Sequence, residues 1–108
     1  MKLASALLAL AVVLSAPARA DDTSELFAKK CAGCHGGDGM GHTKLAEKPG
    51  VKLPDFTGAK WQKETTAKEI VEAIADGVKD TKMPAWKEKV SAEQMAGLAK
   101  YLRTLAKK

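Results

Sequence analysis

The feature that most constrains this chain is the pentapeptide Cys31-Ala32-Gly33-Cys34-His35, which holds both cysteines of the 108-residue sequence. Two cysteines three positions apart, followed directly by a histidine, form the attachment motif of a c-type haem. The thiols form thioethers with the two vinyl groups of the porphyrin, and the imidazole becomes the proximal ligand of the iron. A helical turn across the motif sets both sulfurs along one edge of the ring. The motif therefore predicts one covalently bound haem c, held by both cysteines, with His35 on the iron.

Two other uses of paired cysteines fit the sequence less well. A dithiol redox pair normally follows a strand within an alternating pattern of strands and helices, and no such pattern surrounds this motif. A zinc site could use both cysteines together with His35 and His42. However, structural zinc sites usually have a second pair of closely spaced ligands, and the chain has no third cysteine. Haem attachment remains the favoured interpretation.

The N-terminal 20 residues have the composition of a secretory signal peptide. Lys2 precedes an apolar run over residues 3–14, and the small residues Ala18 and Ala20 mark a cleavage site after Ala20. The alternative is an uncleaved membrane anchor, but the run is shorter than the ~20 apolar residues that a spanning helix needs. We therefore expect export to the periplasm, with no stable membrane insertion once the leader is removed. Export fits the haem, because bacterial c-type haems are attached after the chain has left the cytoplasm.

The remaining residues, 21–108, are expected to form one mono-haem domain and a monomer. Loss of Lys2 and Arg19 with the leader lowers the formal charge from +5 to +3, and two haem propionates would offset most of that. The basic precursor is therefore no argument for a nucleic-acid partner. So short a chain, with 5% aromatic residues, buries little apolar area. A covalently held haem would supply the missing core.

Three segments have a helical pattern and none has the alternation of a strand. The first runs from Asp22 to the motif, with Thr23 or Ser24 as its cap. The second begins with the capping box of Thr66 and Glu69 and ends at Gly77. The third extends over 91–105, from a capping box of Ser91 and Gln94, with Met95, Leu98, Leu102 and Leu105 on one apolar stripe.

The segments between these helices carry turn signals. Four glycines within residues 36–41 cannot continue a helix, and we expect this run to turn closely round the haem edge. Residues 44–58 contain Pro49-Gly50 and Pro54-Asp55 and are expected to form a loop along one side of the ring. The overall prediction is an all-α domain.

Together these residues resemble the class I c-type cytochromes over residues 21–108. The matching features are the haem motif, the glycine run after His35, Phe27 four residues before the first cysteine, Pro54-Asp55-Phe56, Met83-Pro84, and Leu98 with Tyr101 in the last helix. The resemblance implies a compact cytochrome c fold, with three main helices and loops wrapped around one haem. It also implies that the Pro54 carbonyl accepts a hydrogen bond from the His35 ring. Thr23 departs from the family, which often has glycine where the first and last helices cross.

Four side chains offer a second axial ligand for the iron: Met40, His42, Met83 and Met95. Met40 and His42 follow His35 by five and seven residues, a length that barely reaches round the porphyrin at ~3.3 to 3.6 Å per residue. Met95 falls on the apolar stripe of the last helix. Met83 remains, in a turn that Pro84 stiffens. The alternative for Met83 is a buried thioether that only fills a gap.

A His and Met ligand pair raises the reduction potential and leaves no open position on the iron. The resemblance then implies a periplasmic one-electron carrier, not an enzyme, that meets redox protein donors and acceptors transiently. Lysines near the haem edge, with Lys29, Lys30 and Lys82 as candidates by their proximity in the chain, would steer an acidic partner. The alternative is that these lysines only keep the surface solvated. Two alternatives require an open sixth position: a peroxidase-like haem enzyme and a ligand-binding haem sensor. His42 is the only spare histidine for such an enzyme.

Overall fold

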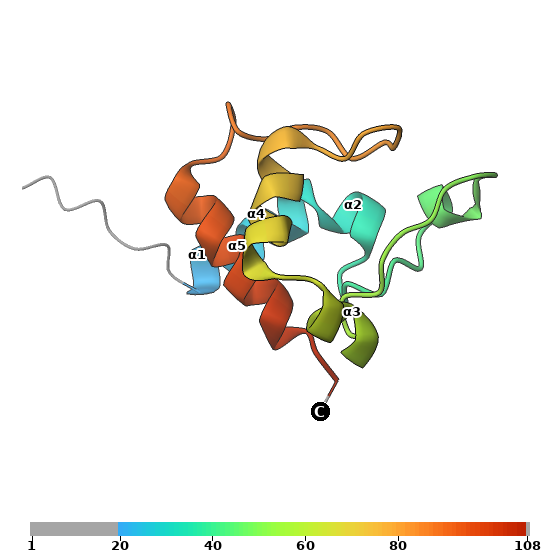
Figure 1. Cartoon of the computed structure of the whole chain (residues 1–108), viewed down its shortest axis with the longest axis horizontal. Coiled ribbons are helices and arrows are strands. Elements are labelled where there is room, and N and C mark those ends of the chain that lie inside the picture. Colours follow the sequence, from blue (N-terminus) through green and yellow to red (C-terminus); the bar gives the residue numbers. More distant parts are fainter. Residues whose placement is uncertain (1–19, 108) are drawn as a thin grey trace, which may run out of the picture.

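Three helices form the frame of the domain: α1 (Ala20–Lys30), α4 (Ala67–Asp76) and α5 (Ala92–Thr104). The computed structural model describes residues 20–107, and within that range it contains helices and loops but no strand. α5 packs against both α1 and α4 (Figure 1). The all-α prediction with three main helices is therefore confirmed. The signal peptide lies outside the described residues except for Ala20, which is the first residue of α1.

The two predicted capping boxes begin α4 and α5. The hydroxyl of Thr66 accepts from the Glu69 amide, and the Glu69 carboxylate accepts from the Thr66 amide. Ser91 and Gln94 make the same reciprocal pair at the start of α5. Each box satisfies two amides that a helix start otherwise leaves unpaired. α4 ends at Gly77 as predicted.

The predicted start of α1 was wrong. The helix begins at Ala20, so Thr23 lies inside it and is buried at 4% exposure. The reason is that the acidic side chain of Asp22 favours the positive N-terminal end of the helix dipole, so the helix has already begun before Thr23. Neither Thr23 nor Ser24 is therefore the residue at which the helix starts.

Three short elements complete the fold. α2 (Ala32–His35) is the helical turn expected across the cysteine motif. The 3-10 helix η1 (Lys44–Glu47) lies within the segment expected to be an irregular loop, and α3 (Ala59–Glu64) was not predicted. With six residues, α3 is too short to show a helical period in the sequence. In Figure 1 the segment around η1 projects away from the three main helices.

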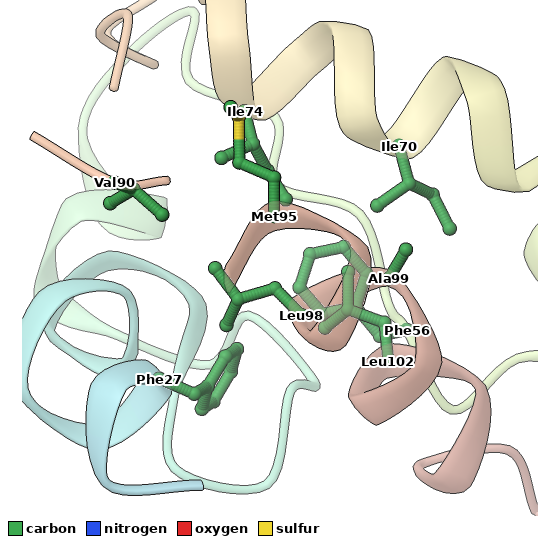
Figure 2. Close-up of a cluster of buried hydrophobic side chains, with 9 residues drawn as sticks. All are labelled: Phe27, Phe56, Ile70, Ile74, Val90, Met95, Leu98, Ala99 and Leu102. Carbon is green, nitrogen blue, oxygen red and sulfur yellow. The ribbon is translucent and has the colours of Figure 1, made fainter. Parts of the chain in front are cut away.

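Nine buried apolar side chains from α1, α4, α5 and the adjoining loops form the core (Figure 2): Phe27, Phe56, Ile70, Ile74, Val90, Met95, Leu98, Ala99 and Leu102. At the contact between α1 and α5, the rings of Phe27 and Tyr101 lie 5.0 Å apart. Met95 is 8% exposed, which confirms its predicted place in the core. Among the helices of residues 20–107, none is long and apolar enough to cross a membrane.

Candidate haem attachment site

The last turn of α1 leads directly into the cysteine motif. The Cys31 amide donates to the Phe27 carbonyl at 2.9 Å, and the His35 amide donates to the Cys31 carbonyl at 2.9 Å. The helical path therefore continues through the motif with only a short break at Cys31. Cys31 is half-buried, Cys34 is exposed, and both are free thiols. The motif thus presents two thiols and an imidazole from one helical turn.

The glycine run closes the end of this turn. The Gly41 amide donates to the His35 carbonyl at 2.8 Å, and the Thr43 hydroxyl donates to the Cys34 carbonyl at 2.8 Å. Gly41 has a φ of 76°, and a Cβ there would lie 3.2 Å from the carbonyl oxygen of Pro54. Only glycine allows the loop to lie this close to the Pro54 backbone. The turn expected after His35 is confirmed, while its course round the haem edge stays a prediction.

The His35 ring lies against the buried ring of Phe56, with 4.9 Å between centroids and 29° between planes. Its Nδ1 is buried and has no hydrogen-bond partner within residues 20–107. Burial lowers the pKa of the imidazole and so favours its neutral form. A neutral imidazole is the form that binds iron. The predicted hydrogen bond from this ring to the Pro54 carbonyl stays a prediction for the haem-loaded protein.

Phe56 is in turn fixed by its backbone. Its amide donates to the Gly39 carbonyl at 2.9 Å, and its carbonyl accepts from the side-chain amide of Gln62 at 2.7 Å. The same amide group of Gln62 donates to the Leu102 carbonyl in α5 at 2.8 Å. Arg103 donates to the backbone carbonyl and the side-chain oxygen of Gln62, each at 3.0 Å. Gln62 thus links α3, α5 and the segment that carries Phe56.

Sequence reasoning missed Gln62 and Arg103. A glutamine on a six-residue helix and an arginine near the end of α5 look like ordinary surface residues. Their side chains join residues about 40 positions apart in the chain. No local pattern in the sequence carries such information, because neither spacing nor helical period relates the two residues.

The two alternative uses of the cysteines gain no support. Burial, together with the neighbouring Cys34, raises the pKa of the Cys31 thiol. Cys-x-x-Cys redox pairs instead depend on a lowered thiol pKa. No group of three or more His, Cys, Asp or Glu side chains in the described part of the chain could hold a metal ion, so the proposed zinc ligands do not come together.

The structure separates the four candidates for the second axial ligand. Met95 is in the core, His42 is exposed, and Met40 is half-buried within the glycine run. Met83 is half-buried and packs against the core cluster from the loop between α4 and α5. In Figure 1 this loop passes over the top of the domain. Met83 is thus a half-buried thioether on a loop far along the chain from the motif.

These residues fit a haem. The motif supplies two free thiols for thioether bonds and a neutral imidazole for the iron, and Met83 supplies a partly accessible thioether. A histidine that binds a metal through one ring nitrogen usually donates a hydrogen bond from the other. In His35, the buried and unpaired Nδ1 is available for that hydrogen bond. The donor set therefore matches the chemistry of a six-coordinate haem c.

Comparison with known proteins identifies the family of the chain. Residues 20–106 match the family described as Cytochrome c. The chain is 33% identical over 82 residues to the Cbb3-type cytochrome c oxidase subunit FixP of Azorhizobium caulinodans, but it spans only 26% of that protein.

Solved structures show the same fold. The KustC0563 c-type cytochrome is 33% identical, with a TM-score of 0.69 over 79% of this chain and 98% of that one. The c-type cytochrome NirC is similar in fold alone, at 22% identity and a TM-score of 0.57 over 81% of this chain and 93% of its own. This chain belongs to the cytochrome c family and carries a covalently bound haem c.

Proposed function

We propose that the chain is a one-electron carrier whose haem c is attached to Cys31 and Cys34 and ligated by His35 and Met83. The observation that carries the proposal is the state of His35. Its imidazole is half-buried, held neutral, and stacked on Phe56, directly after two free cysteines. This arrangement presents one ring nitrogen in a fixed orientation, as a permanent iron ligand requires.

When bound, the haem supplies an iron that gains and loses a single electron. The chain's own residues control how easily this happens. Two thioether links would prevent loss of the cofactor, and the Met83 sulfur would favour the reduced iron and so raise the reduction potential. Because the His35 ring is stacked on Phe56 and the amide and carbonyl of Met83 are both hydrogen-bonded, these two ligands would need to move little between the two oxidation states. Two permanent ligands would also exclude substrates, which is why we propose a carrier and not an enzyme.

We further propose that the Pro54 carbonyl accepts a hydrogen bond from Nδ1 of His35. Two observations support this: Nδ1 is buried and has no hydrogen-bond partner in residues 20–107, and Pro54 lies against the glycine run that follows His35. A carbonyl acceptor at this position would hold the imidazole in one tautomer and make it a stronger iron ligand.

The cellular setting is also a proposal. Residues 1–20 are proposed to be a signal peptide cleaved after Ala20, which leaves a mono-haem domain over 21–108 in the periplasm. We propose that this domain is a monomer that exchanges electrons in brief encounters with redox proteins. The similarity to an oxidase subunit supports an electron-transfer role, because that curated relative is named as part of a cytochrome c oxidase.

The reaction of the reduced protein with carbon monoxide tests the carrier proposal. A stable sixth ligand resists displacement, so the visible spectrum of the ferrous protein is expected to stay unchanged under carbon monoxide. Rapid conversion to a carbon monoxide adduct would show an open iron. That result would favour a haem enzyme or a haem sensor over a carrier.

A further inference from the structure

The backbone of Met83 is bonded on both sides within its own loop. The Val78 amide donates to the Met83 carbonyl at 3.2 Å. On the other side, the Thr81 hydroxyl accepts from the Met83 amide at 3.2 Å and donates to the Val78 carbonyl at 2.7 Å. Thr81 therefore bridges the two ends of the segment 78–83. Both polar backbone atoms of Met83 are paired, and its peptide groups have little freedom to turn.

The backbone of Met83, Pro84 and Ala85 packs closely against Gly77. Gly77 has a φ of 72°, and a Cβ built there would lie 2.7 Å from the Met83 carbonyl oxygen. The same Cβ would lie 3.0 Å from the amide nitrogen of Ala85 and from the carbonyl carbon of Pro84. These neighbours are all backbone atoms, which cannot rotate away as the end of a side chain could. Any side chain at position 77 would therefore push the Met83 segment off the end of α4.

Two further hydrogen bonds fasten the residues that follow. The Trp86 amide donates to the Ile74 carbonyl at 2.8 Å, and the Lys87 amide donates to the Ala75 carbonyl at 3.2 Å. Two of the last carbonyls of α4, which a helix end otherwise leaves to water, thus accept hydrogen bonds from the loop. Met83 lies between this anchored segment and the bridge made by Thr81, so both flanks of the residue are tied to the C-terminal end of α4.

We propose that Gly77 and Thr81 are positioning residues that keep the Met83 thioether at the iron. The proposal rests on the proposed function, in which Met83 is the axial ligand. A methionine side chain has three rotatable bonds and a weakly binding sulfur, so it cannot fix its own position. A ligand held in its bound conformation loses less entropy on binding and competes better with other ligands. The fixed backbone of residue 83 supplies that advantage.

The test uses imidazole, a small ligand that binds ferric iron only by displacing the thioether. Its affinity reports how strongly Met83 competes for the iron. Thr81→Val removes the hydroxyl, and with it both the bond from the Met83 amide and the bond to the Val78 carbonyl, and is expected to tighten imidazole binding about fivefold. Thr81→Ser keeps the hydroxyl and should bind imidazole as the unaltered protein does. Thr104→Val is the matched control, because its exposed hydroxyl donates to the Tyr101 carbonyl at 2.6 Å, outside the loop.

Gly77→Ala has an equally close control in Gly50→Ala. Both glycines have positive φ, at 72° and 78°, but a Cβ at Gly50 would meet nothing within 4 Å. The two variants therefore share the backbone strain and differ in the clash with Met83. We expect Gly77→Ala to tighten imidazole binding more than Thr81→Val does, and Gly50→Ala to leave it unchanged. If Gly77→Ala does not fold, the comparison of Thr81→Val with Thr81→Ser and Thr104→Val tests the positioning role.

The outcomes separate this inference from the function on which it rests. A ferric protein without a thioether-to-iron absorption band would show that Met83 is not the ligand and would overturn both. If the band is present, and Thr81→Val binds imidazole no more tightly than Thr104→Val does, the positioning role is refuted while Met83 keeps its role as ligand. Tighter binding in Thr81→Val that Thr81→Ser reverses would establish the role of the hydroxyl.

Discussion

The imidazole of His35 stacks on the ring of Phe56, 4.9 Å away between centroids. Phe56 is 6% exposed, and its ring also lies 4.7 Å from the ring of Trp61 between centroids. The ring of His35, the proposed proximal ligand, is therefore stacked on a buried aromatic side chain. The backbone of Phe56 is held by hydrogen bonds to the Gly39 carbonyl and from the Gln62 side chain, so these two residues support the orientation of His35 through Phe56.

Gln62→Ala is expected to destabilise the protein by about 1 to 3 kcal/mol, because it removes the side-chain donor from the carbonyls of Phe56 and Leu102. Chemical denaturation would measure the change in the free energy of unfolding. Lys63→Ala is the control, since Lys63 is an exposed neighbour on α3. Equal stabilities of the two variants would contradict the proposed link between α3, α5 and Phe56.

The stability of the folded protein is expected to depend on pH through Asp55. The hydroxyl and amide of Thr57 donate to its carboxylate at 2.6 and 2.9 Å and lower its pKa below the ordinary 3.8. A carboxyl whose pKa is lower in the folded state than in the unfolded state stabilises the folded protein when the pH is above its unfolded-state pKa. This stabilisation is lost as the pH falls through the pKa of the folded state. Asp55→Asn is therefore expected to differ most from the unaltered protein near neutral pH, with the difference shrinking from about pH 5 to about pH 2.

Unfolding curves at several pH values would measure this effect. Glu47→Gln serves as the control, because Glu47 is an exposed carboxylate on η1. A difference between Asp55→Asn and the unaltered protein that stays constant with pH would show that the Asp55 carboxylate has no part in acid unfolding.

The cysteines predict how firmly the haem is held. The purified protein should keep its haem through acid and organic extraction, because thioether bonds survive that treatment. Replacing both Cys31 and Cys34 with alanine should yield a protein whose haem is extracted. The test is the absorbance of the solvent phase. Haem in that phase from the unaltered protein would refute covalent attachment.

Three exposed lysines predict the response to salt. Lys29 and Lys30 end α1 directly before Cys31, and Lys82 precedes Met83. If they steer an acidic redox partner, the bimolecular electron-transfer rate should fall as ionic strength rises. The reason is that salt screens the attraction between charges, with a screening length of about 10 Å at 0.1 M. Replacing these lysines with glutamate should lower the rate at low salt. A rate independent of salt, with each partner tried, would exclude steering by these residues.

The features that the sequence predicted correctly are those with a local cause. The cysteine motif, the capping box of Thr66 and Glu69, and Gly77 at the end of α4 each depend on residues within a few positions of one another. The apolar stripe of α5 was likewise readable because one helical period orders it, and Met95 lies in the core as that period requires.

The features that escaped prediction have causes distant in the chain or too short to show a period. α3 has six residues, and its role as a support for Phe56 depends on Gln62 meeting α5. The start of α1 was misplaced, since Thr23 has the residue type of a cap but follows Asp22, whose acidic side chain favours the first turn of the helix.

The absorption spectrum of ferric Met83→Ala tests the central claim most directly. A thioether bound to ferric iron gives a weak band at the near-infrared edge of the visible spectrum. We expect the unaltered protein to show this band and Met83→Ala to lose it, while Met40→Ala and Met95→Ala keep it. Met95→Ala should instead cost about 2 to 5 kcal/mol of stability, because Met95 is buried in the core. A band that persists in Met83→Ala would contradict the assignment of Met83 as the axial ligand.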